Sequence, residues 1–346
     1  MPKKLLLMGD HFITPNLMLQ GLGDARRSFD IVQGTTPFPL EPFRDIAEVR
    51  EASGSEEEMI DLLQGVSVCV VHHAPLTKRI IAHAKDLKLF IVCRGGPVNV
   101  NLQAATAAGI TIGFTPGRNA VATAEFTVAT ALAALRRIPF TDRGIRNREW
   151  IGTYTYETAG FEINGSTCGL IGYGAIGSRV AKILQGFGAK VLVYDPYSKT
   201  PPDPGVEITS LEDLLKRSRL VSLHARETPE TRKMIGRKQI SLMPRGSVLV
   251  NCARGSLLDY DALQEALESG HLFAAAADVF PDEPIPTDSP LLRLQNFVMT
   301  PHIAGGTQQA AEKAAHIAGE EIRRYMSGAP LSFCANPETQ VTQVRS

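Results

Sequence analysis

The stretch LIGYGAIGSRV, from Leu170 to Val180, constrains the fold more than any other part of this 346-residue chain. It contains the pattern GxGxxG, formed by Gly172, Gly174 and Gly177, between a strand-like apolar run and a helical segment. A helix that begins at such a turn presents free backbone amides and the positive end of its dipole to a phosphate group. The pattern therefore predicts a parallel α/β domain that binds a dinucleotide.

The acidic residue that accompanies such a turn is Asp195, which closes the next strand-like run, VLVYD. A carboxylate there accepts hydrogen bonds from the adenosine ribose hydroxyls and repels a 2′-phosphate. The sequence therefore predicts NAD as cofactor, although Lys199 in the following turn could admit the phosphate of NADP. Ala175 and Ile176, inside the turn, are predicted cofactor contacts.

Strand-like and helical segments alternate along nearly the whole chain, which predicts α/β architecture with parallel sheets. The length exceeds what one hydrophobic core usually serves. We expect two doubly wound domains with a cleft between them. The first is a flavodoxin-like domain built from residues 1–115 and 302–330, with four strands before residue 115. The second is a Rossmann domain over residues 116–301 with six strands, and a poorly ordered tail covers residues 331–346.

The composition excludes several classes of partner. The chain has 36 basic and 36 acidic residues, so nucleic acid and anionic membranes are not expected to bind it. The N-terminal apolar run ends too early for a signal peptide, and Ala120 to Leu135 is too short to span a bilayer. We expect that segment to form a packed helix and the surface of a homodimer. The five cysteines form no CxxC pair and the histidines show no ligand spacing, which predicts reduced thiols in the cytoplasm and no metal.

Polar residues follow three apparent strands in the second half of the chain. They are Arg254 in VNCARGS, Asp278 and Glu283 in DVFPDEP, and His302 in TPHIAGG. Open α/β sheets bind their ligands at the carboxyl ends of the strands. The sequence therefore predicts a functional site from these side chains.

The motifs GYGAIG, VYDP, VNCARG, DVFPDEP and TPHIAGGT, in this order, resemble the D-isomer-specific 2-hydroxyacid dehydrogenases, and within them most of all the D-3-phosphoglycerate dehydrogenases. The resemblance covers about Leu5 to Met326. It implies an NAD-dependent oxidoreductase that transfers a hydride between NAD(H) and carbon 2 of a D-2-hydroxy acid or 2-oxo acid. It also implies that the first domain binds the substrate and that the last long helix returns to it.

The resemblance implies a role for each residue of the predicted site. His302 is the acid and base at the substrate oxygen, Glu283 orients its ring, and Arg254 holds the substrate carboxylate or carbonyl oxygen. Asp278 bonds the nicotinamide carboxamide. Further implied cofactor contacts are His224, Ala225, Cys252, Ala253, His302 and Gly305. Relatives usually read His-x-Pro at His224, whereas here Arg226 stands in place of the proline.

The first domain leaves the substrate open. The loop CRGGPVNVN is implied to bind the substrate through Arg94, Gly95, Gly96 and Asn99. Phosphoglycerate dehydrogenases usually carry an Arg-Ser pair where this chain has His72 and His73, so a phosphate would need Arg94, Arg118 or a protonated histidine. The alternatives are 3-phosphoglycerate, glyoxylate or hydroxypyruvate, and another sugar acid.

Two other functions share the fold. The C-terminal-binding-protein corepressors resemble it too, so an NAD(H)-sensing interaction protein is the alternative of another class, although the chain lacks long disordered flanks. Formate dehydrogenase is disfavoured because relatives with that activity carry Gln where Glu283 stands. Regulation by serine through an added domain is not expected, since few residues follow Met326.

Overall fold

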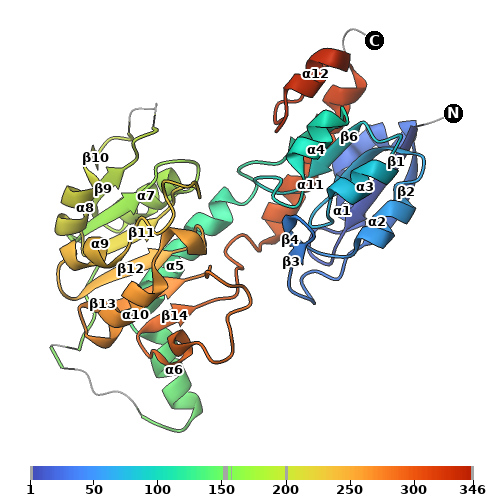
Figure 1. The fold of residues 1–346 in the computed structure, drawn as a ribbon. Helices are drawn as coiled ribbons and strands as arrows, with labels where there is room; N and C mark the ends of the chain where they lie inside the picture. Colours follow the sequence, from blue (N-terminus) through green and yellow to red (C-terminus); the bar gives the residue numbers. More distant parts are fainter. Residues whose placement is uncertain (1–2, 151–154, 157, 199–201, 344–346) are drawn as a thin grey trace. The chain divides into compact units, whose positions relative to one another are not determined.

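The structure is a computed structural model that describes residues 3–150, 155–156, 158–198 and 202–343. The chain divides into two compact units (Figure 1). Unit 1 comprises Met1–Asn119 and Gly306–Ser346, and unit 2 comprises Ala120–Gly305. Each unit is built on its own parallel sheet, which confirms the predicted α/β class.

The sheet of unit 1 has five parallel strands in the order β2-β1-β5-β6-β7, the flavodoxin-like order. Its strands are β1 (Lys3–Gly9), β2 (Phe29–Thr35), β5 (Val66–Val71), β6 (Leu89–Val92) and β7 (Thr111–Phe114). The central strands are almost wholly apolar because helices cover both faces of the sheet. The sequence did not predict β2, whose mixed apolar and polar residues are only partly buried, as is typical of an edge strand. It did not predict the short hairpin of β3 (Arg44–Ile46) and β4 (Val49–Ala52) either.

Side chains before the helices of unit 1 cap their first turns. Thr14, Ser55, Thr77, Asn101 and Thr307 each accept a hydrogen bond from a backbone amide of the helix that follows. At Ser55, the Glu58 amide donates to the side-chain hydroxyl at 3.2 Å. The helices are α1 (Pro15–Leu22), η1 (Gly23–Ser28), α2 (Glu56–Leu62), α3 (Lys78–His83), α4 (Leu102–Ala107), α11 (Gln308–Met326) and α12 (Glu338–Gln343).

The long helix α11 belongs to unit 1 although it follows unit 2 in the sequence (Figure 1). It packs directly against α1, with Gly21 on one helix facing Gly319 on the other. A Cβ atom on either glycine would overlap the backbone of the opposite helix. This close approach ties the last part of the chain to the first.

The expectation of a poorly ordered tail is wrong for the described part of residues 331–346. Leu331 and Asn336 are buried, and Cys334 pairs with Gly113 in an antiparallel bridge. The Asn336 side chain accepts a hydrogen bond from the Ile112 amide at 2.8 Å and donates to the Ile110 carbonyl at 2.9 Å and the Thr106 hydroxyl at 3.0 Å. The polar sequence favours disorder, but one asparagine serves backbone groups at the edge of the sheet and orders the segment.

The sheet of unit 2 has seven parallel strands in the order β10-β9-β8-β11-β12-β13-β14. All six predicted strands are present. The seventh, β10, is a three-residue edge strand too short for a periodicity to show in the sequence. The strands are β8 (Thr167–Ile171), β9 (Lys190–Tyr194), β10 (Val206–Ile208), β11 (Leu220–Leu223), β12 (Ser247–Asn251), β13 (Leu272–Ala277) and β14 (Phe297–Met299).

Two separate apolar cores cover the two faces of this sheet. The helices of unit 2 are α5 (Ala120–Leu135), α6 (Ile138–Arg146), α7 (Gly177–Gly186), α8 (Leu211–Arg217), α9 (Arg237–Leu242), η2 (Gly255–Leu257), α10 (Tyr260–Glu268) and η3 (Pro290–Arg293). Helix α5, expected as a dimer surface, packs most of its residues against α7, β12 and β13 within unit 2. No helix in the described part of the chain is both long and apolar enough to cross a membrane.

We expect Asn336→Ala to lower the free energy of unfolding of unit 1 by about 2 to 3 kcal/mol, because it leaves buried groups of Ile110 and Ile112 without partners. Chemical denaturation followed by circular dichroism measures this change. The exposed residue of the same segment, Glu338, provides the control substitution Glu338→Gln. Equal stability of the two variants would contradict the anchoring role of Asn336.

Candidate active site

The glycine-rich turn joins β8 to α7, and each of its glycines has a different reason to be there. Gly172 has a φ of +102°, and a Cβ atom on it would lie 2.7 Å from the backbone of His224. A Cβ atom on Gly177 would overlap the carbonyl oxygen of Gly172. Gly174 has no atom within 4 Å of its ideal Cβ position. The protein itself therefore requires two of the glycines, while the third has open space on the side where a phosphate would approach.

Asp195 follows β9 and its carboxylate is fixed beside this turn. One oxygen accepts a hydrogen bond from the Tyr173 amide at 2.7 Å, and the other accepts one from the Tyr197 amide at 2.9 Å. Tyr173 lies between the first two glycines of the motif, so the carboxylate is held next to the predicted pyrophosphate position. Lys199, the residue that could admit a 2′-phosphate, lies outside the described residues.

His224 follows β11 and packs against the same turn. Its backbone amide donates to the Ile171 carbonyl at 2.7 Å, while the ring Nε2 has no hydrogen-bond partner in the described part of the chain. Burial lowers the pKa of His224 to about 4, so its ring is neutral at physiological pH. The next residue, Ala225, is half-buried, and Arg226 is exposed.

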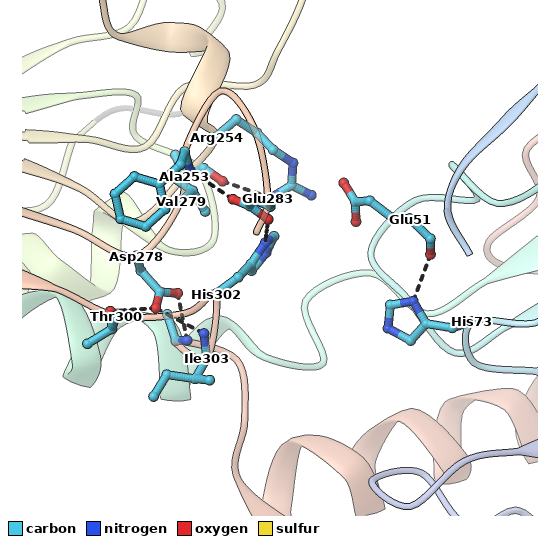
Figure 2. A network of polar contacts seen from close by, with 12 residues as sticks. Glu51, His73, Ala253, Arg254, Asp278, Val279, Glu283, Thr300, His302 and Ile303 are labelled. Atoms are coloured by element: carbon cyan, nitrogen blue, oxygen red, sulfur yellow. Dashed lines mark hydrogen bonds and ion pairs between the residues drawn. The ribbon is translucent and has the colours of Figure 1, made fainter. Parts of the chain in front are cut away.

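Arg254, Glu283 and His302 come from three loops at one edge of the sheet. The loops follow β12, β13 and β14, which are parallel neighbours, so their carboxyl ends meet at the same edge. The helix α7 also begins at this edge, because β8 belongs to the same parallel sheet. Figure 2 shows the three side chains together.

The imidazole of His302 is bonded to the carboxylate of Glu283 (Figure 2). Nδ1 of His302 lies 2.7 Å from Oε2 of Glu283, and the other carboxylate oxygen accepts a hydrogen bond from the Phe280 amide at 2.8 Å. An ionised carboxylate only accepts hydrogen bonds, so Nδ1 of His302 carries the proton. Nε2 is the ring nitrogen that Glu283 does not bind. The two side chains are 26% and 20% exposed, so both are half-buried but reachable by a ligand.

Asp278 holds the loop that carries His302. Its carboxylate, 1% exposed as a residue, accepts hydrogen bonds from the Thr300 hydroxyl at 2.6 Å, the Ile303 amide at 2.9 Å and the Ala304 amide at 2.8 Å. Its backbone carbonyl also accepts from the His302 amide at 2.8 Å. Burial raises the pKa of Asp278, and these hydrogen bonds oppose that rise. His302 has a φ of +55°, a conformation that non-glycine residues rarely adopt, and Asp278 stabilises it.

Asn251 holds the turn that carries Arg254 in a similar way. Its side chain donates to the Arg254 carbonyl at 2.9 Å and accepts from the Ala253 amide at 3.1 Å. Arg254 itself donates to the Ala253 carbonyl at 2.7 Å. Cys252 is buried and burial raises the pKa of its thiol to about 11, so it is not a thiolate. Gly305, the last predicted cofactor contact, is the last residue of unit 2.

In unit 1 the structure gives the four predicted substrate residues different surroundings. Arg94 is buried and pairs with the carboxylate of Glu51. Gly95 and Gly96 have no atom within 4 Å of their ideal Cβ positions. Asn99 is 0% exposed, and its amide group donates to the Ala74 carbonyl at 2.8 Å.

Sequence reasoning missed the residues that support the predicted ones. They are Asp10, Glu51, Asn251 and Thr300. Asn251 and Thr300 stand at strand ends beside predicted site residues, and that position was the available signal. Across the described residues, no group of three or more His, Cys, Asp or Glu side chains could hold a metal ion.

The comparisons with known proteins agree with this geometry. Residues 128–304 match the family model described as "D-isomer specific 2-hydroxyacid dehydrogenase, NAD binding domain". This segment of the chain is therefore an NAD-binding domain, and the predicted cofactor is confirmed. It includes the glycine-rich turn, Asp195 and the loops of Arg254, Glu283 and His302.

Curated relatives cover both units. The chain is 38% identical over 289 residues to the D-3-phosphoglycerate dehydrogenase of Methanocaldococcus jannaschii, a match that covers 82% of this chain and 54% of the relative. It therefore spans about half the length of that relative. It is 33% identical over 321 residues to the glyoxylate reductase of Korarchaeum cryptofilum, with 92% of each chain covered.

A solved structure shares the fold. The TT0316 protein of Thermus thermophilus superposes with a TM-score of 0.81 at 31% identity, and the match covers 96% of this chain and 99% of that protein.

Proposed function

Because the chain belongs to the D-isomer specific 2-hydroxyacid dehydrogenase family, we propose that it transfers a hydride between NAD(H) and carbon 2 of a D-2-hydroxy acid or the matching 2-oxo acid. The observation that carries the proposal is the bond between His302 and Glu283 at the sheet edge where the NAD-binding turn lies. An acid and base must lie beside the nicotinamide for this reaction. The parallel sheet brings the loop of His302 and the glycine-rich turn to the same edge, which supports this placement.

We assign proton transfer to Nε2 of His302. NAD, when bound, supplies or accepts the hydride. In the reduction, His302 donates a proton to the carbonyl oxygen, and in the oxidation it removes one from the hydroxyl. Glu283 binds Nδ1 and orients the ring. Arg254 binds the substrate carboxylate, because a planar guanidinium can grip two oxygens at once.

We assign the cofactor contacts to the loops of unit 2. The turn from Gly172 to Gly177, with Gly174, Ala175 and Ile176, places backbone amides at the start of α7 for the pyrophosphate. Asp195 binds the adenosine ribose. Asp278 keeps a carboxylate lone pair for the nicotinamide carboxamide besides the hydrogen bonds that it accepts from its own loop. The remaining assigned contacts are His224, Ala225, Cys252, Ala253 and Gly305.

We assign substrate binding in unit 1 to the loop after β6. The open backbone of Gly95 and Gly96 supports contact with a carboxylate. Arg94 adds a cation close to this loop, although Glu51 shares its charge. Asn99 is buried and joins this loop to the segment after β5 through the hydrogen bond from its amide group to the Ala74 carbonyl, and we keep it among the assigned substrate-site residues.

The names of the relatives point to two types of substrate for this chain. One is named for 3-phosphoglycerate and the other for glyoxylate, so the substrate is 3-phosphoglycerate, a small 2-oxo acid such as glyoxylate or hydroxypyruvate, or another sugar acid. The alternative of another class, an NAD(H)-sensing interaction protein, keeps cofactor binding without turnover. A screen of NADH oxidation across these 2-oxo acids separates the two classes.

We propose a homodimer and base it on α6 rather than α5. Ile138 and Ile145 on α6 are 53% and 54% exposed, and Trp150 beyond it is 88% exposed. Exposed large apolar side chains in one segment are typical of a protein interface. Sedimentation velocity at micromolar concentration checks this proposal, and a monomer would contradict it.

We also propose a cytoplasmic location. All five cysteines are free thiols, and four of them are buried. Thiols of this kind persist in reducing compartments. A disulfide in freshly isolated protein would count against this location.

We expect His302→Asn to lower kcat by about 10²- to 10⁴-fold, because the variant lacks the group that exchanges the proton. Asparagine tolerates the positive φ of this position, so the loop should keep its conformation. NADH binding, followed by fluorescence, should change less than about twofold. The exposed His316 on α11 provides the control His316→Asn. Equal loss of turnover and NADH binding in His302→Asn would refute the assigned role.

We expect Asp195→Ala to weaken NADH binding by about tenfold or more, because hydrogen bonds from the ribose to a charged acceptor are lost. Discrimination against NADPH should fall at the same time, since no carboxylate repels the 2′-phosphate. Fluorescence titration with both cofactors measures the two effects. Asp203, bonded to the Tyr173 hydroxyl near the same turn, provides the control Asp203→Ala. An unchanged preference between the cofactors in Asp195→Ala would contradict the ribose assignment.

A further inference from the structure

The carboxyl ends of four neighbouring strands in unit 1 carry a cluster of ionisable side chains. Asp10 follows β1, His72 and His73 follow β5, Arg94 follows β6, and Arg118 follows β7. These strands are adjacent in the parallel sheet, so the side chains gather at one edge. This is the edge at which open α/β sheets bind ligands.

Arg94 and His73 already have partners inside the cluster. Arg94 pairs with the Glu51 carboxylate and donates to the Glu51 carbonyl at 2.9 Å. That carbonyl also lies 2.8 Å from Nδ1 of His73 (Figure 2). The His73 ring packs against both Phe38 and Phe43, with ring centroids 4.2 and 5.6 Å away. The charge of Arg94 is therefore balanced within the protein.

Arg118 is held at the end of a buried chain of three side chains. Oδ2 of Asp10 lies 2.6 Å from Nδ1 of His72, and Nη2 of Arg118 lies 3.3 Å from Nε2 of the same ring. The guanidinium can only donate, so Nε2 of His72 accepts and Nδ1 carries the proton that Asp10 receives. The other oxygen of Asp10 accepts hydrogen bonds from the amides of Phe12 at 2.9 Å and Ile13 at 2.8 Å. Arg118, His72 and Asp10 therefore form one continuous chain of hydrogen bonds, in which Arg118 donates to His72 and His72 donates to Asp10.

The other two nitrogens of Arg118 lack hydrogen-bond partners among the described residues. Nε and Nη1 are buried, and neither has a hydrogen-bond partner in the described part of the chain. Burial lowers the pKa of Arg118 only to about 10, so the guanidinium stays charged at neutral pH. Buried charges and buried donors in proteins are normally paired. The Asp10 carboxylate does not touch the guanidinium, because the neutral His72 ring stands between them.

We propose that Arg118, positioned by His72 and Asp10, binds an oxyanion at the end of the substrate away from its reacting carbon. The proposal rests on the proposed function, in which the substrate is a D-2-hydroxy acid or the matching 2-oxo acid. A carboxylate or phosphate oxygen is the acceptor that the Nε and Nη1 donors lack, and a guanidinium matches both. The substrate is thus a 2-hydroxy acid with a second acidic group. Arg118, and not Arg94, recognises that group.

Three 2-hydroxy acids that differ only at the distal group test this site. D-Glycerate ends in a neutral hydroxymethyl group, D-malate in a carboxylate, and D-3-phosphoglycerate in a phosphate. Each is titrated calorimetrically into the full chain saturated with NADH, which cannot react with a hydroxy acid. We expect D-malate or D-3-phosphoglycerate to bind at least about tenfold more tightly than D-glycerate. The tighter of the two identifies the oxyanion.

The variant Arg118→Gln should abolish this preference and leave D-glycerate binding within about twofold. Arg118→Lys keeps the charge without the planar fork, so it should retain part of the preference and remains informative if the glutamine variant does not fold. Arg44→Gln, at an exposed arginine of the same unit, serves as the control and should retain all of it.

Two results would overturn the proposal. One is equal binding of all three acids to the unmodified chain, as expected if internal water satisfies Arg118. The other is a preference that survives in Arg118→Gln. Failure of the proposed function looks different: the preference for a distal acid would persist, but NADH would not be oxidised by hydroxypyruvate, oxaloacetate or phosphohydroxypyruvate.

Discussion

The hydrogen bonds of Asp278 to the loop from Thr300 to Ala304 are the interaction on which the rest of the site depends. They keep His302 in a left-handed backbone conformation and so direct its ring toward Glu283. Without this carboxylate, the amides of Ile303 and Ala304 would lose their acceptor, and we expect the loop to relax to a more favourable φ. Asp278, which we expect to contact the cofactor, therefore also positions the imidazole ring of His302.

The sequence predicted the fold wherever burial imposes a pattern on it. Central strands such as β8 and β12 are covered on both faces, so their residues are mostly apolar and easy to recognise. Edge strands such as β2 and β10 are not covered, and their sequences resemble loops. The ordered tail escaped prediction for a related reason. Asn336 stabilises it by hydrogen bonds to backbone groups distant in sequence, and such bonds leave no periodicity.

The polar residues that follow strands in the sequence were enough to predict which loops meet, because a parallel sheet brings its carboxyl ends to one edge. Arg254, Glu283 and His302 were found in this way. The sequence could not predict which charged side chains pair with one another. No local pattern relates Glu51 to Arg94, or Asp10 to His72, since these contacts join segments that only the tertiary structure brings together. The burial of Asn99 was equally hidden, because no local pattern in a loop sequence shows whether a side chain is covered.

The substitution of His72 and His73 for the usual Arg-Ser pair changes what the first unit can recognise. A surface arginine would bind phosphate directly, whereas His72 is buried, neutral and already bonded on both ring nitrogens. Asp10 holds the His72 ring in place, and the ring in turn holds the Arg118 guanidinium. The ring also keeps the Asp10 carboxylate away from the guanidinium. A direct Asp–Arg pair would have satisfied the arginine and left no affinity for an external anion. The His72 ring between the two side chains fixes the position of the Arg118 guanidinium but leaves its Nε and Nη1 donors unpaired among the described residues. Only with unpaired donors can the guanidinium bind an external anion.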